Sequence, residues 1–236
     1  MYHCQIHFYL SGGQCRAFDL IKEITPYENF THQFTQSDTP DLSKAASADV
    51  IIANAQGMDA KEIAAQLLSA RQDTAELILI LEKNRISGLT PYLSQITEIW
   101  TAPMTDEEIR FRYERWRQTY KQGKDLWQAQ HYLEATIDHV PNLVWYKDKH
   151  GIHEKVNTSF CRTVGKTRHQ VEGRGHAYIW DVEHDDPACI ESEQEVMSSR
   201  RTCVSEELVQ TGAGVRTLMT YKSPLYDLDG SVMGTV

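Results

Sequence analysis

The 236-residue sequence predicts an α/β unit with a five-stranded parallel sheet, then a long helix, then a smaller α+β unit with a five-stranded antiparallel sheet. In the first half, short apolar runs alternate with helical patterns, as expected of parallel strands joined by crossover helices. Residues 105–137 then contain no proline and only one glycine. The last part of the chain consists largely of short strand patterns separated by turn residues.

Five short runs mark the predicted parallel strands. Residues 49–53 and 77–81 are apolar and bounded by polar residues, which is typical of strands buried on both faces. We expect strands at residues 5–10, 30–34, 49–53, 77–81 and 98–101, and helices at residues 14–24, 42–48, 60–70 and 89–94. Five strands in such an arrangement favour the flavodoxin-like order 2-1-3-4-5. Asp59 is interpreted as the N-cap of the helix that follows it.

A long helix is predicted from Thr105, with acidic residues in its first turn and a break or kink near Gly123. This helix separates the two folded units. We therefore divide the chain into a first domain at residues 1–120, a linker helix at residues 121–140 and a second domain at residues 141–236, which stops inside its last strand.

The second domain is predicted to contain five strands and three helices. The strands lie at residues 143–146, 153–156, 203–210, 215–226 and 231–236, and the helices at residues 158–164, 168–172 and 188–199. Residues 173–187 are predicted to be rich in loops. Turns are expected at residues 148–151, 212–214 and 227–230. Asn157 is expected to cap the helix that begins near Thr158, and His153 is expected on the strand face opposite Val156.

Three motifs in the second domain carry a family resemblance. Lys147-Asp148-x-x-Gly151 is followed by Val156-Asn157 and Phe160; residues 171–174 read V-E-G-R, and residues 222–230 read K-S-P-L-Y-D-L-D-G. In this order and spacing they resemble a PAS sensor domain. The resemblance covers residues 130–236 and implies a sensory role.

The first domain resembles a two-component receiver domain whose ionic residues are missing. In that family an acidic pair follows the first strand, a phosphate-accepting aspartate ends the third, a threonine or serine ends the fourth, and a lysine precedes a proline after the fifth. The corresponding positions are occupied by Ser11, Gly12, Asn54, Glu82 and Ala102. Phosphoryl transfer needs carboxylates that hold Mg²⁺ and a carboxylate nucleophile. We therefore predict a receiver-like domain that is not phosphorylated.

A seam of mostly aromatic residues recurs along the linker helix at spacings of three and four. The seam consists of Ile109, Tyr113, Trp116, Tyr120 and Trp127. Such a seam predicts a parallel coiled coil and hence a homodimer. In the alternative, the first half of the helix packs on the parallel sheet and the second half caps the second domain. We expect a mixture of the two. The basic residues of this helix are interpreted as a solvated face.

The resemblance to PAS domains implies a possible pocket between sheet and helices for a small organic or carboxylate ligand. Candidate pocket residues are Trp145, Phe160, Arg174, His176, Tyr178 and Trp180. An empty, fully packed core that serves dimerisation or relay is an equal alternative. Haem is disfavoured, because a lone histidine such as His176 or His184 is more often a surface or hydrogen-bonded residue. Flavin chemistry is disfavoured because residues 173–178 lack the required cysteine motif.

Composition excludes several functional classes. The net charge of -9 argues against a nucleic-acid-binding surface over the whole chain. No apolar run is long enough to cross a bilayer, and the N-terminus does not resemble a signal peptide, so we expect a cytoplasmic protein. The five cysteines are scattered and are expected to be free thiols. Neither a metal site nor a catalytic set of residues is recognised, so we do not expect this chain to be an enzyme.

The order of the two domains resembles sensors that precede GGDEF diguanylate cyclase domains in bacterial signalling proteins. We expect such an output domain to follow, with a histidine kinase as the alternative. Two functions remain open from the sequence. The chain is either a ligand-gated sensor or a ligand-free scaffold that brings output domains together.

Overall fold

The computed structural model describes residues 2–185, 187–211 and 214–236. The chain forms two compact units, Met1–Leu126 and Trp127–Val236. Helix α4 (Asp106–His139) contributes its first part to one unit and its last part to the other.

The first unit contains a five-stranded parallel sheet in the order β2-β1-β3-β4-β5, as predicted. Its elements are β1 (Cys4–Ser11), α1 (Arg16–Glu23), β2 (Phe30–Ser37), α2 (Leu42–Ser47), β3 (Val50–Asn54), α3 (Ala60–Ala70), β4 (Glu76–Glu82), the 3₁₀ helix η1 (Lys83–Tyr92) and β5 (Glu98–Ala102). The helix predicted at residues 89–94 is replaced by η1. Pro91, inside this segment, has no N–H to donate to an α-helical hydrogen bond.

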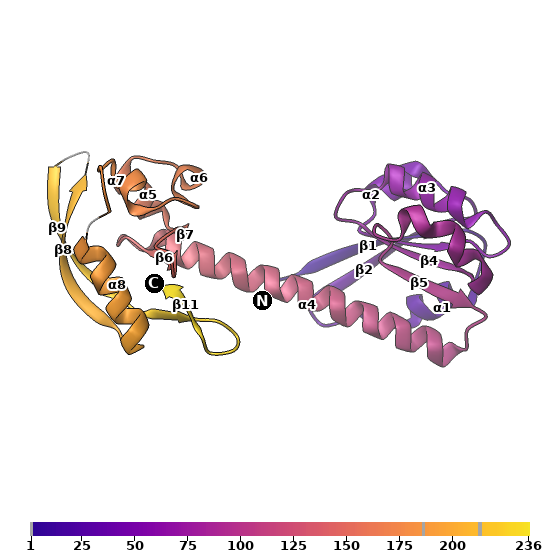
Figure 1. Cartoon of the computed structure of the whole chain (residues 1–236). Coiled ribbons are helices and arrows are strands. Elements are labelled where there is room, and N and C mark those ends of the chain that lie inside the picture. Colours follow the sequence, from indigo (N-terminus) through magenta and orange to yellow (C-terminus); the bar gives the residue numbers. More distant parts are fainter. Residues whose placement is uncertain (1, 186, 212–213) are drawn as a thin grey trace. The chain divides into compact units, whose positions relative to one another are not determined.

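Helices cover both faces of this sheet (Figure 1). Helix α1 and the first part of α4 bury one face, and α2 and α3 bury the other. The central strands β3 and β4 are buried along almost their whole length, because side chains of both alternating sets meet a helical layer. Asp59 caps α3 as predicted, accepting hydrogen bonds from the backbone N–H groups of Lys61 and Glu62.

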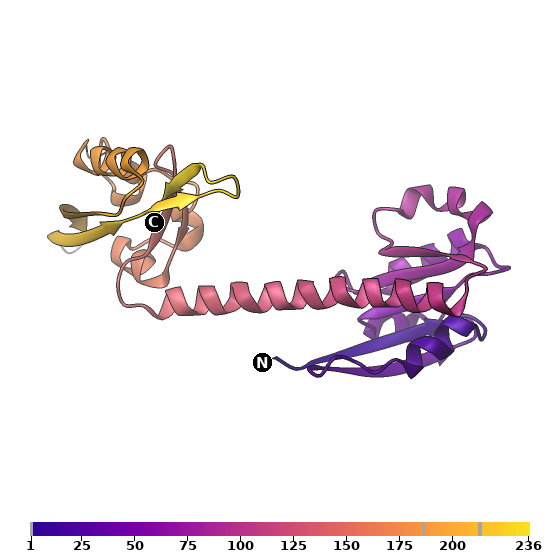
Figure 2. The same ribbon diagram turned by 90° about the horizontal axis from the view of Figure 1, so that it is seen from below.

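Helix α4 departs from the predicted break, and its first part packs on the parallel sheet, as the alternative to the dimer seam predicted. It continues through Gly123, so the predicted break is wrong. Ile109, Tyr113 and Trp116 of the predicted dimer seam are buried in the core of the first unit. Figure 2 shows this part of α4 lying along the sheet. The spacing of these three residues therefore reflects packing within the first unit. A helix that packs on its own sheet and a helix that packs on a second copy show the same three- and four-residue spacing of apolar side chains.

In the part of the second unit that the structure describes, there are two antiparallel sheets and four short helices besides the end of α4. Its elements are β6 (Trp145–Asp148), β7 (His153–Val156), α5 (Thr158–Val164), α6 (Arg168–Val171), α7 (His176–Trp180), α8 (Pro187–Ser199), β8 (Cys203–Thr211), β9 (Gly214–Lys222), β10 (Pro224–Tyr226) and β11 (Val232–Thr235). Helix α7 falls in the segment predicted to be rich in loops. Of the turn predicted at residues 212–214, positions 212 and 213 lie outside the described residues.

The antiparallel pairing of the second unit is confirmed, but its strands divide differently. Strands β10-β11-β6-β7 form one sheet and β8-β9 form another. The single strand predicted at residues 215–226 is interrupted at Ser223, which separates β9 from β10. Strand β9, which precedes Ser223, pairs only with β8 in the described part of the chain.

The two faces of β7 are also not those predicted. His153 and Val156 are both buried, whereas Glu154 and Lys155 between them are exposed. The pairing of β6 with β7 shifts register between Tyr146 and Lys147. Such an irregularity interrupts the two-residue alternation of a strand.

Within the described residues, no helix has both the length and the hydropathy that crossing a bilayer requires.

Candidate functional site

The residues at the receiver-like positions lie at one edge of the parallel sheet. Strand β1 ends at Ser11, β3 at Asn54, β4 at Glu82 and β5 at Ala102. Because carboxyl ends of parallel strands meet at the same edge, the topology places these residues where open α/β sheets hold their ligands.

Gly12 and Asn54 approach each other closely at this edge. Gly12 has a φ of +102°, and a Cβ atom added to it would lie 2.4 Å from the Asn54 carbonyl oxygen. The Asn54 side chain donates a hydrogen bond to the Gly13 carbonyl oxygen at 3.3 Å and accepts one from the Gln56 N–H at 3.3 Å. Position 12 therefore has no room for a side chain, acidic or otherwise.

The carboxylates near this edge serve local backbone groups. Glu82 accepts a hydrogen bond from the Gly57 N–H at 2.9 Å, and hydrogen bonds from its own N–H and that of Gly57 lower the pKa of Glu82. Asp59 is used as the helix cap. Among the described residues, no three His, Cys, Asp or Glu side chains gather as a metal ion would require. The residues at this edge do not fit the Mg²⁺ ion of a phosphorylated receiver.

Four of the six predicted pocket residues come together in the second unit. Phe160 of α5 is buried, with its ring centroid 6.0 Å from that of Trp145 on β6 and 5.7 Å from that of Trp180 on α7. His176 lies 6.1 Å from Trp180, and the buried His153 lies 5.5 Å from Phe160. These rings form an aromatic cluster between the strands and the short helices.

The space inside this cluster is small. A cavity of about 20 Å³ is lined by all five rings, which leaves room for roughly one water molecule. Arg174 and Tyr178 do not line it. The Arg174 guanidinium lies over the Tyr178 ring at 5.5 Å, and Tyr178 is 51% exposed. These two side chains lie at the surface, Tyr178 on α7 and Arg174 just before it, and their assignment to a ligand pocket stays a prediction.

A buried charged network adjoins this cavity, and sequence reasoning missed it. Lys147 on β6 contacts Glu193 on α8 at 2.5 Å, and Lys222 on β9 contacts Glu207 on β8 at 2.5 Å. The ammonium group of Lys222 also lies 3.9 Å from Glu193 and 3.5 Å from the sulfur of Cys189. Two ion pairs from four elements thus meet around one thiol. We define Lys147, Cys189, Glu193, Glu207 and Lys222 as the charged network.

Burial and charge shift several pKa values in this region. Burial by itself lowers the pKa of Lys222, but the hydrogen bond with Glu207 and the neighbouring Cys189 and Glu193 leave it above its usual value. Burial raises the pKa of the Cys189 thiol against the opposing effect of Lys147. The pKa of His153 is lowered to about 3, chiefly by burial and then by the Lys147 charge.

Only a weak sequence signal marks the charged network. Lys147 and Lys222 each appear in a motif of the resemblance, as a hairpin residue and a strand end. Ser205, Glu206 and Glu207 form a polar run on a strand, which is typical of a solvated face, yet the Glu207 side chain is only 12% exposed. A lysine and a glutamate on separate strands have no sequence spacing that pairs them, so only the fold brings them together.

A second cavity, of about 150 Å³, lies on the outer side of the charged network. It is lined by Lys147, Cys189 and Glu193 together with His150 and His176. Lys147, His176 and Cys189 also line the small internal cavity. Lys147, which pairs with Glu193, therefore stands between this outer cavity, which we call the vestibule, and the aromatic cluster.

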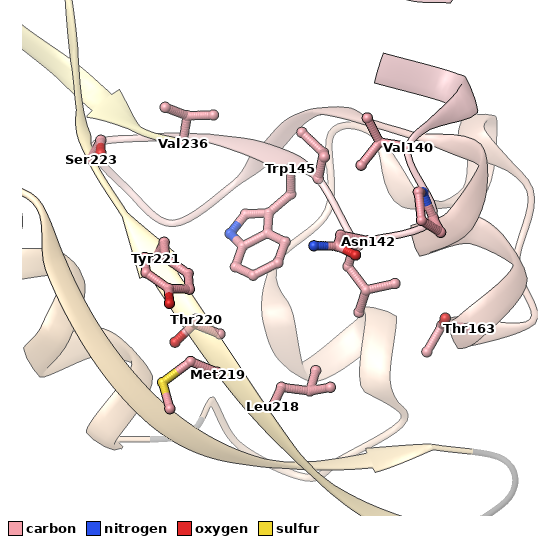
Figure 3. A pocket seen from close by; sticks show the side chains of 13 residues that line it. Val140, Asn142, Trp145, Thr163, Leu218, Met219, Thr220, Tyr221, Ser223 and Val236 are labelled. Carbon is pink, nitrogen blue, oxygen red and sulfur yellow. The ribbon is translucent and has the colours of Figure 1, made fainter. Parts of the chain in front are cut away.

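A third cavity, of about 640 Å³, lies between β9 and the segment that leads into β6 (Figure 3). The Trp145 ring extends into it from β6, facing Leu218, Met219 and Tyr221 of β9. Leu143, Trp145, Leu218 and Thr220 line both this cavity and the small internal one, so the two adjoin.

The end of α4 is tied to the second unit by polar contacts. The buried Asn157 caps α5 by accepting the Phe160 N–H at 3.0 Å, as predicted, and donates to the carbonyl oxygens of Ile137 at 3.0 Å and Asn142 at 2.9 Å. Arg168 of α6 pairs with Asp138 at 2.6 Å. Helix α4 thus ends against α6 and against α5, which contributes Phe160 to the aromatic cluster.

The fold of the second unit agrees with its family. Residues 137–236 match the family described as PAS fold. This part of the chain is therefore a PAS domain, and PAS membership supports a sensory signalling role. A comparison with curated proteins finds no match.

Several solved structures each resemble less than half of the chain. A Vibrio cholera VqmA–ligand–DNA complex is 18% identical with a TM-score of 0.36, over 43% of this chain and 46% of that chain. The PAS domain of Bordetella pertussis BvgS is 20% identical with a TM-score of 0.32, over 45% and 79%. The PAS domain of an HTR-like protein from Haloarcula marismortui is 21% identical with a TM-score of 0.40, over 49% and 94%. This chain spans about half of the VqmA chains that it matches.

Proposed function

We propose that this chain is the sensory and regulatory region of a bacterial signal-transduction protein. The observation that carries the proposal is the PAS domain at residues 137–236, joined through α4 to a parallel α/β unit. In this proposal the PAS domain receives the stimulus and the first unit acts without phosphorylation. Helix α4 connects the two, and the protein is placed in the cytoplasm.

The stimulus is proposed to be a small polar molecule that contacts the charged network. Burying ion pairs is costly, and similar apolar residues would often be equally or more stable there. Lys147, which pairs with Glu193, stands between the vestibule and the aromatic cluster, so a ligand carboxylate or heterocycle that bonds to Lys147 would displace Glu193. Because Glu193 belongs to α8, displacement would shift this helix, as ligand-driven population shifts require.

A ligand-free scaffold is the alternative, and the internal cavity of about 20 Å³ favours it. Native mass spectrometry and an absorption spectrum of the purified chain distinguish the two. A retained molecule that Lys147→Met abolishes and Lys155→Met preserves supports the sensor. Lys155 is a suitable control because its side chain on β7 is 65% exposed and does not line the vestibule. An empty protein that dimerises regardless of added ligand supports the scaffold. A Soret band would contradict our expectation against haem.

The first unit is proposed to be a receiver-like domain that does not accept phosphate. Asn54 at the end of β3, Ala102 at the end of β5 and the closed position at Gly12 support this. Incubation with acetyl phosphate and Mg²⁺, followed by intact mass measurement, is expected to leave the mass unchanged. Stoichiometric addition of phosphate at any residue would contradict the proposal.

A homodimer through α4 remains part of the proposal, through the exposed residues of its second half. Leu126, Trp127, Tyr132 and Leu133 are exposed, whereas Ile109, Tyr113 and Trp116 are buried. Light scattering on Leu133→Lys and Trp127→Lys variants tests the exposed face, with Lys121→Glu as a control. A dimer mass unchanged in both variants would exclude this part of α4 as the interface.

The output is proposed to be a diguanylate cyclase of the GGDEF type, with a histidine kinase as the alternative. This proposal rests on the resemblance of residues 222–230 and of the domain order to sensors that precede GGDEF domains. The 236-residue chain itself is not proposed to be an enzyme. Assay of the natural full-length protein for cyclic di-GMP synthesis and for autophosphorylation distinguishes the two. Activity of the 236-residue chain alone would contradict its regulatory role.

A further inference from the structure

Strand β2 forms one edge of the parallel sheet and lacks the features that usually block an edge. It stands at the end of the strand order, with β1 as its neighbour. Its eight residues, F-T-H-Q-F-T-Q-S, include no proline and no lysine, arginine, aspartate or glutamate. All of them pair with β1 in unbroken register, without a bulge. Proteins commonly block long edge strands with such features, because an open edge invites another strand.

The contacts with β1 show which backbone groups of β2 face outward. The Cys4 N–H donates to the Asn29 carbonyl oxygen at 2.9 Å. At the other end, the Gly12 N–H donates to the Ser37 carbonyl oxygen at 2.9 Å. The backbone groups of successive residues in a strand point to opposite sides. The odd-numbered residues of β2 therefore bond to β1, and the even-numbered residues direct both N–H and C=O to the open edge.

Two of the outward groups are already bonded within the chain. The Phe30 N–H donates to the Tyr27 carbonyl oxygen at 2.8 Å. The Gln36 carbonyl oxygen accepts a hydrogen bond from the Lys44 ammonium group at 2.9 Å. The other outward groups between these two positions have no hydrogen-bond partner among the described residues. They are the carbonyl oxygen of Phe30, both backbone groups of His32 and of Phe34, and the N–H of Gln36.

These free groups are complementary to themselves. An antiparallel partner presents its residues in reverse order, and the residues of a hydrogen-bonded pair exchange N–H and C=O. When two β2 strands meet with Gln33 opposite Gln33, His32 stands opposite Phe34 of the second copy. These two residues then exchange two hydrogen bonds. One pair further out, the Gln36 N–H reaches the Phe30 carbonyl oxygen of the second copy, and twofold symmetry repeats each bond.

Other centres of symmetry fit the edge less well. Pairing centred on His32 places Phe34 opposite Phe30, whose N–H is already bonded to Tyr27. Pairing centred on Phe34 places His32 opposite Gln36, whose carbonyl oxygen already accepts from a lysine. Each of these leaves a free group without a partner. Pairing centred on Gln33 engages every free group and disturbs neither of the bonded ones.

We propose that β2 is a dimerisation edge, where two copies of this chain pair their β2 strands antiparallel about a twofold axis at Gln33. The two five-stranded sheets become one continuous sheet. The occupant is a second copy because the free groups from Phe30 to Gln36 match their own reverse order, and an isologous contact requires such self-complementarity. The contact needs no phosphate, no ligand of the PAS domain and no pairing of α4, so it is additional to the function proposed above.

The side chains of β2 suit this contact on both faces of the sheet. Residues opposite each other on neighbouring strands share a face. On one face the exposed Gln33 meets its own counterpart, and the exposed Thr31 meets Thr35. On the other face His32 meets Phe34, both half-buried, and the two rings form a cross-strand pair. Because β2 holds no Lys, Arg, Asp or Glu, no like charges of these residues meet across the axis.

Amide hydrogen exchange of the full chain at increasing protein concentration is the first test. The amides of His32, Phe34 and Gln36 are expected to exchange at least tenfold more slowly in concentrated than in dilute solution, because pairing protects the outward N–H groups. The amides of Thr31 and Gln33 bond to β1 in both states and serve as internal controls. Exchange at His32 and Phe34 that stays the same up to the solubility limit of the chain would overturn the proposal.

A disulfide trap tests the register. The proposed pairing places position 33 opposite its own counterpart, at the Cα separation of ~4.5 Å of a non-hydrogen-bonded pair, which a disulfide can bridge. Gln33→Cys is therefore expected to crosslink to itself under mild oxidation. Thr31→Cys, also exposed on this face, is the matched control, because its counterpart lies four residues further along, at least ~13 Å away. Peptide mass mapping distinguishes this crosslink from those of the native cysteines. Crosslinking of Thr31→Cys but not of Gln33→Cys would contradict the register.

Charge substitutions at position 33 test the twofold symmetry. Gln33→Lys or Gln33→Glu places like charges opposite each other at the axis, so each variant alone is expected to raise the dissociation constant at least tenfold. An equimolar mixture of the two should restore association, because a lysine then faces a glutamate.

Gln66→Lys, the same change at an exposed position of α3, is the control for a general effect of charge. Sedimentation velocity measures association, and circular dichroism verifies that each variant is folded. Association that Gln33→Lys leaves unchanged and that Leu133→Lys abolishes would place the dimer on α4 alone and overturn the proposal.

Discussion

The ammonium group of Lys147 lies 2.5 Å from the Glu193 carboxylate, and more than nine-tenths of each side chain is buried. This pair joins the first strand of the PAS domain to helix α8. It stands beside a second pair, Lys222 and Glu207, so the interior carries two positive and two negative charges. An interior of this kind depends on every partner being present, which makes it sensitive to single substitutions.

Lys147→Met or Glu193→Met alone is expected to destabilise the second unit by about 3–5 kcal/mol, because each leaves a buried charge without its main partner. The double variant should recover much of this loss. Urea unfolding of the four proteins in a double-mutant cycle measures the coupling. Asp106→Asn, which breaks the exposed pair with Arg16, is the control and should change stability little. Additive losses would show that the pair is not coupled.

Gly12→Ala is expected to destabilise the first unit by at least ~2 kcal/mol. The substitution combines a left-handed backbone with a Cβ placed 2.4 Å from the Asn54 carbonyl oxygen. Gly13→Ala is the matched control, since nothing lies within 4 Å of its added Cβ. Thermal unfolding of both variants measures the difference. Similar melting temperatures would mean that position 12 does accept a side chain, which would reopen the question of an acidic residue there.

Asn157→Ala is expected to cost about 2–4 kcal/mol, because it removes a helix cap and leaves several buried backbone groups without partners. Asp59→Ala removes only a cap, with bonds to Lys61 and Glu62, and should cost about 1 kcal/mol. Hydrogen exchange in urea, followed separately in α5 and α3, gives both values. If the two losses were equal, the bonds from Asn157 to Ile137 and Asn142 would contribute nothing measurable.

The second unit is expected to lose stability in mild acid through His153. Its pKa is about 3 when folded and near 6.5 when unfolded, so the unfolded chain binds the extra proton between these values. The contribution of neutral His153 to the free energy of unfolding is complete above pH 6.5. It falls by roughly 1.4 kcal/mol per pH unit as the pH drops toward 3. His153→Asn keeps a donor for the Arg174 carbonyl oxygen and should flatten this slope. NMR titration of the His153 ring provides the direct measurement, and a midpoint above pH 6 would contradict the assignment.

The parallel unit was predictable in detail from local patterns. Runs such as residues 49–53 and 77–81 are long and apolar enough to identify strands buried on both faces, and their spacing leaves room only for crossover helices. Asp59 and Asn157 were recognised as helix caps because capping is a local interaction, decided within three residues. The receiver-like positions could be compared one by one because each directly follows a strand.

The sequence by itself determined the order of elements, the PAS motifs and the absence of acidic residues where a receiver needs them, since all of these depend on neighbours along the chain. Only the tertiary structure decided that Tyr113 and Trp116 pack in the core of the first unit, that Arg174 and Tyr178 do not line the small internal cavity, and that β9 and the segment leading into β6 flank the cavity of about 640 Å³. It also paired Lys147 with Glu193. These relationships join residues far apart in sequence, and a helical stripe or a lone lysine has the same local pattern whichever partner it meets.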